Sequence, residues 1–263
     1  MIYHYTSIDA LHSIFSSIGP LSNMDDEHLE RFLFFRASAA LSMNDPTESQ
    51  LVPNAFKRLE VSVDDIRSIS LFNGIEYIAS FSMKDDDLTM WRCYGSDGKG
   101  VAIGFNEEVI MDVWSECGIM AKLSWFGECE YVDENDIDEY IRSNPNYEEY
   151  MNDKSNHLPL LHLYNECMRF KHKAFRDEEE YRIIVQDVFS NGSFAKNGRI
   201  VPYVNVPFPV RALRTIVVGP RVDFDYSIFA ISQVLKNQLD GYLMHYPALE
   251  SPSFFLHSSV PYK

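Results

Sequence analysis

The sequence predicts an α+β fold, in which residues 1–263 form a single domain around a mixed or split β-sheet core with peripheral helices. Strand-like and helix-like segments follow one another without the regular βαβ rhythm of a doubly wound sheet. Neither an internal repeat nor a clean linker divides the chain. Apolar residues make up 46% of the sequence and aromatic residues 14%, which is typical of a well-packed globular protein.

The N-terminal part is expected to open with a strand at 2–6, whose exit at Thr6 or Ser7 caps a helix that stops at Gly19-Pro20. That helix is indicated by apolar residues at helical spacing, namely Leu11, Ile14, Phe15 and Ile18. The pattern then predicts helices at 25–35 and 106–117, a loop or short helix at 86–94, and strands at 36–43, 75–83 and 100–105.

The C-terminal part begins with two expected strands within 119–132, separated by Gly127. An acidic, tyrosine-rich segment at 133–153 and a longer helix at 159–175 predict a helical insertion over 133–175. The remaining elements are expected to be a helix at 226–239 and strands at 179–186, 199–205, 213–218 and 242–246.

The overall charge argues against nonspecific binding to nucleic acid. The formal net charge is −16, so the chain would neutralise phosphates poorly. This does not exclude a local basic cleft that binds nucleic acid. The four cysteines include no CxxC pair, which argues against a zinc site and against a secreted disulfide scaffold. Because the chain shows no signal-like start and no run of about 20 apolar residues, we expect a cytoplasmic, soluble protein without membrane contact.

The short motifs of dinucleotide dehydrogenases, P-loop NTPases, α/β-hydrolases and zincins are missing from the sequence. A first candidate segment is Tyr3-His4-Tyr5-Thr6-Ser7, at the exit of the opening strand. Alternation places His4 and Thr6 on one strand face and Tyr5 on the other. The pair could grip a ligand, or it could be only a surface histidine and a helix cap.

Two further segments combine polar and aromatic residues. Asn44-Asp45-Pro46-Thr47-Glu48 is either a turn that starts a helix or a set of polar groups presented at the end of a strand. In Met90-Trp91-Arg92-Cys93-Tyr94, helical spacing puts Trp91 and Tyr94 on one face. These two rings could fill core space or form a wall on which a nicotinamide or base stacks.

The last candidate segment is Glu178-Glu179-Glu180-Tyr181-Arg182, at the start of a late strand. Glu178, Glu180 and Arg182 share one strand face. Such a run of charges is usual on a solvated face. Alternatively, Arg182 could hold one of the carboxylates in a fixed orientation. A carboxylate held in this way can polarise a ribose hydroxyl or stabilise a developing cation.

Taken in this order, the four segments resemble an uncharacterised bacterial family that includes AbiGi-like abortive-infection proteins of phage defence. The resemblance rests on residues 3–6, 44–48, 90–94 with 99–105, and 178–182. Phe175 departs from it, since a tryptophan is common there in the family. This difference concerns packing.

More distantly, the opening His-Tyr-Thr, the helix Asp-Ala-Leu-x-x-Ile-Phe and Gly-Pro-Leu-Ser resemble ADP-ribosyltransferase-like domains, including DarT-like toxins. This resemblance implies a core of that type with NAD as substrate. It implies that Glu180, oriented by Arg182, is catalytic, and that a nicotinamide stacks on Trp91 or Tyr94, with Tyr77 as another candidate ring. The NAD-binding residues are expected to be His4, Tyr5, Thr6, Asn44, Asp45, Trp91 and Tyr94.

The resulting hypothesis is an enzyme that uses NAD to modify a protein or nucleic-acid acceptor, as a toxin or phage-defence effector. An alternative is a non-catalytic binding or regulatory module, such as an antitoxin-like protein with an operon partner. In that case the same residues would be scattered or satisfied by their neighbours. A third alternative, a hydrolase with Asp45, Glu48, Glu178 and Glu180 around a metal, lacks a compact metal-binding spacing.

Overall fold

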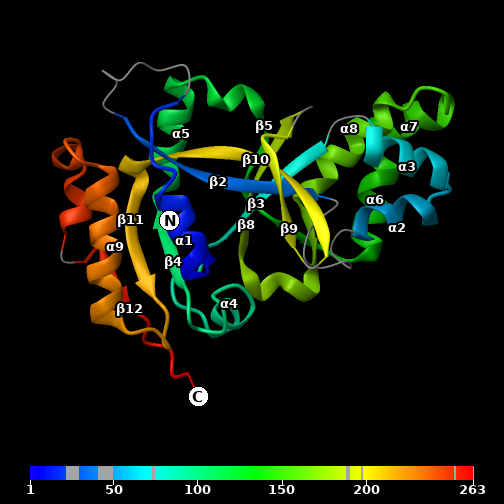
Figure 1. Ribbon diagram of the computed structural model, residues 1–263. Coiled ribbons are helices and arrows are strands. Elements are labelled where there is room, and N and C mark those ends of the chain that lie inside the picture. The colour runs from blue at the N-terminus through cyan, green and yellow to red at the C-terminus, as the bar shows by residue number, and fades with distance from the viewer. Residues whose placement is uncertain are drawn as a thin grey trace. The chain divides into compact units, whose positions relative to one another are not determined.

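A computed structural model describes residues 1–21, 30–40, 50–72, 75–187, 190–196, 198–251 and 253–262 (Figure 1). Its contacts group the chain into two compact units, which are described separately. Unit 1 comprises Met1–Phe35, Phe81–Ala121 and Asn205–Lys263, and unit 2 comprises Arg36–Ser80 and Lys122–Val204. Three strands begin in one unit and end in the other, namely β2 (Phe32–Ala39), β3 (Ile75–Ser82) and β10 (Arg199–Pro209).

The sheet of unit 1 is built around β4 (Val101–Phe105), all of whose residues are buried. On one edge β4 pairs antiparallel with β1 (Ile2–Thr6), with His4 opposite Ile103. On the other edge it pairs antiparallel with β11 (Leu213–Val218), which in turn runs parallel to β12 (Phe255–His257). Figure 1 labels β4, β11 and β12 of this sheet.

Side-chain caps start the helices of unit 1. Ser7 Oγ accepts a hydrogen bond from Ala10 N (3.1 Å) at the start of α1 (Ile8–Phe15), and Asn106 Oδ1 accepts one from Val109 N (3.1 Å) before α5 (Glu107–Glu116). Asp87 caps α4 (Leu88–Cys93), and Asp223 caps α9 (Phe224–Gln238). Of the two caps expected for the first helix, Thr6 or Ser7, the structure uses Ser7, and the helix expected at 106–117 follows the cap Asn106.

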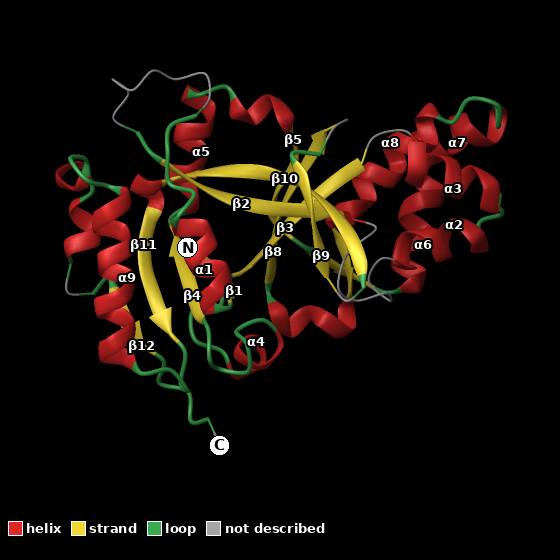
Figure 2. Ribbon diagram, in the orientation of Figure 1, coloured by secondary structure: helices red, strands yellow, loops and turns green. Residues whose placement is uncertain are grey.

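The sheet of unit 2 pairs β8 (Glu180–Asp187) antiparallel with β5 (Leu123–Glu128), and β8 also pairs with β3. Ser38 of β2 lies opposite Ile78 of β3, and β9 (Gly192–Lys196) forms a hairpin with β10. A separate parallel pair joins β6 (Glu130–Val132) to β7 (Phe170–His172). The predicted mixed sheet with several helices is thus confirmed (Figure 2).

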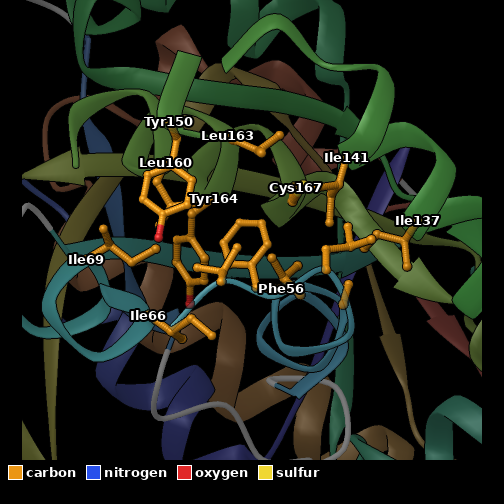
Figure 3. Close-up of a cluster of buried hydrophobic side chains, with 14 of the residues drawn as sticks. Phe56, Ile66, Ile69, Ile137, Ile141, Tyr150, Leu160, Leu163, Tyr164 and Cys167 are labelled. Carbon is orange, nitrogen blue, oxygen red and sulfur yellow. The ribbon is translucent and has the colours of Figure 1, made fainter. Parts of the chain in front are cut away.

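The helices of unit 2 enclose an apolar core in which Phe56, Tyr150, Leu160 and Tyr164 converge (Figure 3). These helices are α2 (Leu51–Arg58), α3 (Val63–Phe72), α6 (Glu134–Ser143), α7 (Pro145–Asn152) and α8 (Leu158–Glu166). Within the described residues, no helix is both long and apolar enough to cross a membrane.

The described residues also form short 3-10 turns: η3 (Ile119–Lys122), η4 (Cys167–Arg169), η5 (Lys173–Glu178), η6 (Val210–Ala212), η7 (Leu243–His245) and η8 (Pro247–Glu250).

Several of the predicted elements were wrong. Residues 32–35 belong to strand β2 and not to a helix, because their buried phenylalanines fit a covered strand as well as a buried helix. The helix predicted at 159–175 ends at Glu166, and β7 and two of these turns occupy the rest.

The predicted strand at 242–246 is the turn η7, which follows Gly241 with its positive φ of 79°, and the last strand is β12. Gly127 lies inside β5 and does not separate two strands. The hairpin strand β9 was not predicted.

Candidate functional site

His4, Tyr5 and Thr6 lie on β1 in unit 1. The half-buried His4 ring contacts Phe35 and Phe81, with ring centroids 5.1 and 5.3 Å apart. The buried Tyr5 ring packs edge-on against Trp91 at 4.8 Å, and its hydroxyl donates to Lys84 O (3.1 Å) and accepts from Asp87 N (3.1 Å). Burial raises the pKa of Tyr5, so it stays a neutral hydroxyl that ties β1 to the start of α4.

Trp91, within α4, and Tyr94, at the C-terminal end of this helix, have different surroundings. Trp91 is fully buried, and its Nε1 donates to Asp86 Oδ1 at 2.7 Å. Tyr94 is 38% exposed, so it is the candidate ring that a ligand can reach directly. Tyr77, the other ring considered, is buried in unit 2. Asn44, Asp45 and Glu48 lie outside the described residues.

In unit 2, the predicted catalytic pair is buried within a cluster of charges. Arg182 Nε donates to Glu180 Oε1 (2.8 Å) and Arg182 Nη2 to Glu180 Oε2 (3.2 Å). Lys171 Nζ, from β7, lies 2.5 Å from Glu180 Oε2 and 2.6 Å from Glu178 Oε2. We call Lys171, Glu178, Glu180 and Arg182 the Glu180 cluster. Of the two interpretations of this run of charges, a solvated face is wrong for Glu180 and Arg182, and Arg182 does hold a carboxylate in a fixed orientation.

The backbone around the cluster fixes its geometry. Arg182 Nη1 donates to Met168 O (2.8 Å) and Phe170 O (3.3 Å), and Glu180 N donates to the Tyr131 hydroxyl (2.7 Å). Burial alone would raise the pKa of the Glu180 carboxyl, but Arg182 and Lys171 outweigh it and lower this pKa below its ordinary value. Glu180 is therefore ionised at neutral pH and held in one orientation.

Lys171 was missed by the sequence analysis. The sequence did contain a hint, because Lys171 is a cation nine positions before Glu180 and could form an ion pair with that carboxylate. The expected helix over 159–175 hid this signal, whereas β7 brings Lys171 beside the start of β8.

A second missed residue is Glu76 on β3, which is buried in unit 2. Ser124 Oγ on β5 donates to Glu76, at 3.2 Å from each carboxylate oxygen. Burial raises the pKa of Glu76 to about 7, and the hydrogen bond from Ser124 offsets this only in part. The described residues contain no group of three or more His, Cys, Asp or Glu side chains arranged to hold a metal ion.

The site residues thus fall into two separate sets. His4, Tyr5, Thr6, Trp91 and Tyr94 belong to unit 1, and Glu180 and Arg182 belong to unit 2. Chemically, the Glu180 cluster offers a fixed carboxylate whose two oxygens already accept hydrogen bonds. The unit 1 set offers one exposed ring and a buried aromatic pair.

Part of the chain matches a known protein family. Residues 90–183 match a family model described as a protein of unknown function, DUF2971. That range contains Trp91, Tyr94 and the whole Glu180 cluster. No curated protein and no solved structure matches the chain. The match agrees with the expected uncharacterised family, and it names neither the AbiGi-like nor the DarT-like proteins, so what these residues resemble is a domain without an assigned activity.

Proposed function

We propose that this chain is a non-catalytic binding or regulatory module, in which Glu180 holds the fold and does not act on a substrate. One observation carries the proposal: Lys171 and Arg182 engage both oxygens of Glu180, whose side chain is 4% exposed. A ribose hydroxyl would reach this carboxylate only if the buried, charge-assisted contacts around it opened. The resemblance to AbiGi-like proteins supports a role in phage defence, beside a partner protein.

The buried candidates of unit 1 support the same proposal. The Tyr5 hydroxyl already donates one hydrogen bond and accepts another, and the Trp91 indole already donates to Asp86. Buried polar groups with such partners are typical of structural residues.

A second proposal is an ADP-ribosyltransferase-like enzyme that uses NAD to modify a macromolecular acceptor. It is favoured by the fixed orientation and lowered pKa of Glu180, which suit a carboxylate that stabilises a cationic transition state. In this proposal His4 and Thr6 bind NAD and the exposed Tyr94 stacks on nicotinamide.

Label transfer distinguishes the two proposals. Purified protein is incubated with labelled NAD and cell lysate, and wild type is compared with Glu180→Gln, Tyr94→Leu and the control Glu128→Gln at an exposed position. The first proposal predicts no label above the protein-free background for any variant. Labelling by wild type and Glu128→Gln that is lost in Tyr94→Leu and in folded Glu180→Gln would instead establish the enzyme.

A further inference from the structure

Asp86 of unit 1 fastens a distant segment of the chain to α4. Besides accepting from Trp91 Nε1, its Oδ1 accepts from Ser258 Oγ (2.5 Å), and its Oδ2 accepts from Ser259 N (2.7 Å) and Ser259 Oγ (2.9 Å). Burial opposes ionisation of Asp86, but these hydrogen bonds outweigh it and lower its pKa. We call residues 258–262 the strap.

The strap lies over the aromatic pair of unit 1. Val260 and Tyr262 pack against the buried cluster that contains Tyr5, Met90 and Trp91. The guanidinium carbons of Arg92 and Arg221 lie 5.8 and 5.6 Å from the centroid of the Tyr262 ring. The Tyr262 hydroxyl donates to Asp97. An aromatic ring is thus bound by two cations and one hydrogen-bond acceptor.

The backbone beneath this ring is shaped to receive it. A Cβ atom on Gly98 would lie 3.1 Å from Tyr262 Cε2, and Gly98 has a positive φ of 75°. Only glycine adopts this conformation readily and leaves room for the ring. We call Arg92, Asp97, Gly98 and Arg221 the ring seat.

The strap is attached mainly by side chains. Its backbone is joined to the sheet by Ser258 N, which donates to Val218 O at 2.9 Å. Beyond that point, Ser259 N donates to Asp86 and Val260 N to Ser258 Oγ (3.3 Å). In the described part of the chain, residues 259–262 belong to no strand or helix. Their release therefore breaks no β-ladder. It requires the loss of a few hydrogen bonds and of the packing and cation contacts that Val260 and Tyr262 make.

The charges beside the ring seat indicate what could replace Tyr262. Arg221 pairs with Asp97, but the exposed side chains of Arg92 and Lys99 form no ion pair with a carboxylate in the described residues. Tyr262 brings no negative charge to these cations. In a chain of net charge −16, two such cations next to a ring site suit a ligand that is both planar and anionic.

We propose that the ring seat binds a nucleotide, with the strap as its resident occupant within the same chain. The base would take the place of the Tyr262 ring, with an exocyclic amino group donating to Asp97, and its phosphate would lie near Arg92 and Lys99. Because an occluded site binds only in the fraction of molecules with the strap released, the strap lowers the apparent affinity for the nucleotide.

The test is calorimetric titration of the full chain with AMP, adenosine and inorganic phosphate. Tyr262→Ala removes the occupant ring and should tighten AMP binding by about tenfold or more over wild type. The control Tyr226→Ala changes a tyrosine that is 70% exposed in the same unit, and it should bind AMP as wild type does. Adding Arg92→Ala to Tyr262→Ala should weaken AMP binding more than adenosine binding, because it removes a phosphate contact.

The Asp86 attachment is tested separately by hydrogen exchange at the Ser259 amide. Asp86→Asn should speed this exchange, while Asp85→Asn, at the exposed neighbouring carboxylate, should leave it unchanged. The proposal is overturned if Tyr262→Ala binds AMP no better than wild type does, or if Tyr226→Ala gives the same gain. It is also overturned if phosphate binds Tyr262→Ala as tightly as AMP does, or if a Ser-Ser-Val-Pro-Tyr peptide binds that variant while AMP does not.

Discussion

Lys171 and Glu180 form an ion pair with a nitrogen–oxygen distance of 2.5 Å, and their side chains are only 2% and 4% exposed. Glu178 and Arg182 join them, so that the Glu180 cluster places two cations against two carboxylates. A charge buried without a partner is costly, whereas a cluster of balanced charge with many hydrogen bonds is tolerated. The Glu-x-Glu-x-Arg segment therefore ties β8 to β7.

Removing the lysine should destabilise unit 2. Lys171→Met leaves Glu178 without the ion pair and Glu180 with one cation in place of two, and we expect the free energy of unfolding to fall by about 3–5 kcal/mol. Urea denaturation measures this loss.

Lys173→Met provides the matched control. Lys173 pairs with Asp133 across 2.7 Å, but its side chain is 55% exposed, so its removal should cost much less than the removal of Lys171. Equal losses in the two variants would contradict a special role for the buried lysine.

The sequence revealed the positions of the charged residues more readily than their surroundings. Alternation correctly put Glu180 and Arg182 on one face of β8, but it could not show that both faces of this strand are covered, and all of residues 180–185 are buried. The helix caps at Ser7 and Asn106 were predictable because they depend on neighbouring residues alone. The roles of Lys171 and Ser124 could not be predicted in this way, because their contacts depend on strand pairing across the fold.

Glu76 should make stability depend on pH. Its pKa is raised to about 7 in the folded protein from an ordinary value of 4.5, so folding favours the protonated carboxyl. This contribution is present below the unfolded pKa and is lost as the pH rises through about 7. Relative to wild type, Glu76→Gln should gain about 2–3 kcal/mol of unfolding free energy between about pH 4 and about pH 8.

Urea denaturation of both proteins across this pH range measures the effect. Ser124→Ala serves as a companion variant, because it removes the hydrogen bond that lowers the Glu76 pKa. In this variant, the loss of stability that accompanies Glu76 ionisation should occur at higher pH. A pH-independent difference between wild type and Glu76→Gln would show that Glu76 titrates normally.

Gly95 should tolerate no side chain. A Cβ atom there would lie 2.5 Å from Trp91 Cε3 and 3.1 Å from Trp91 Cα, so Gly95→Ala must displace the buried indole or the helix that carries it. We expect a loss of about 1–3 kcal/mol of unfolding free energy. Gly19→Ala is the control, since its nearest contact would be 3.9 Å away. Equal unfolding midpoints for the two variants would contradict this tight packing.

The role of Glu180 is tested most directly by the free energy of unfolding of Glu180→Gln, compared with wild type in urea. If Glu180 is a structural residue whose carboxylate compensates Lys171 and Arg182, its neutralisation in Glu180→Gln should lower the free energy of unfolding by about 3–5 kcal/mol. A catalytic carboxylate kept at the expense of stability would behave in the opposite way. A Glu180→Gln protein as stable as wild type, or more stable, would contradict the structural role.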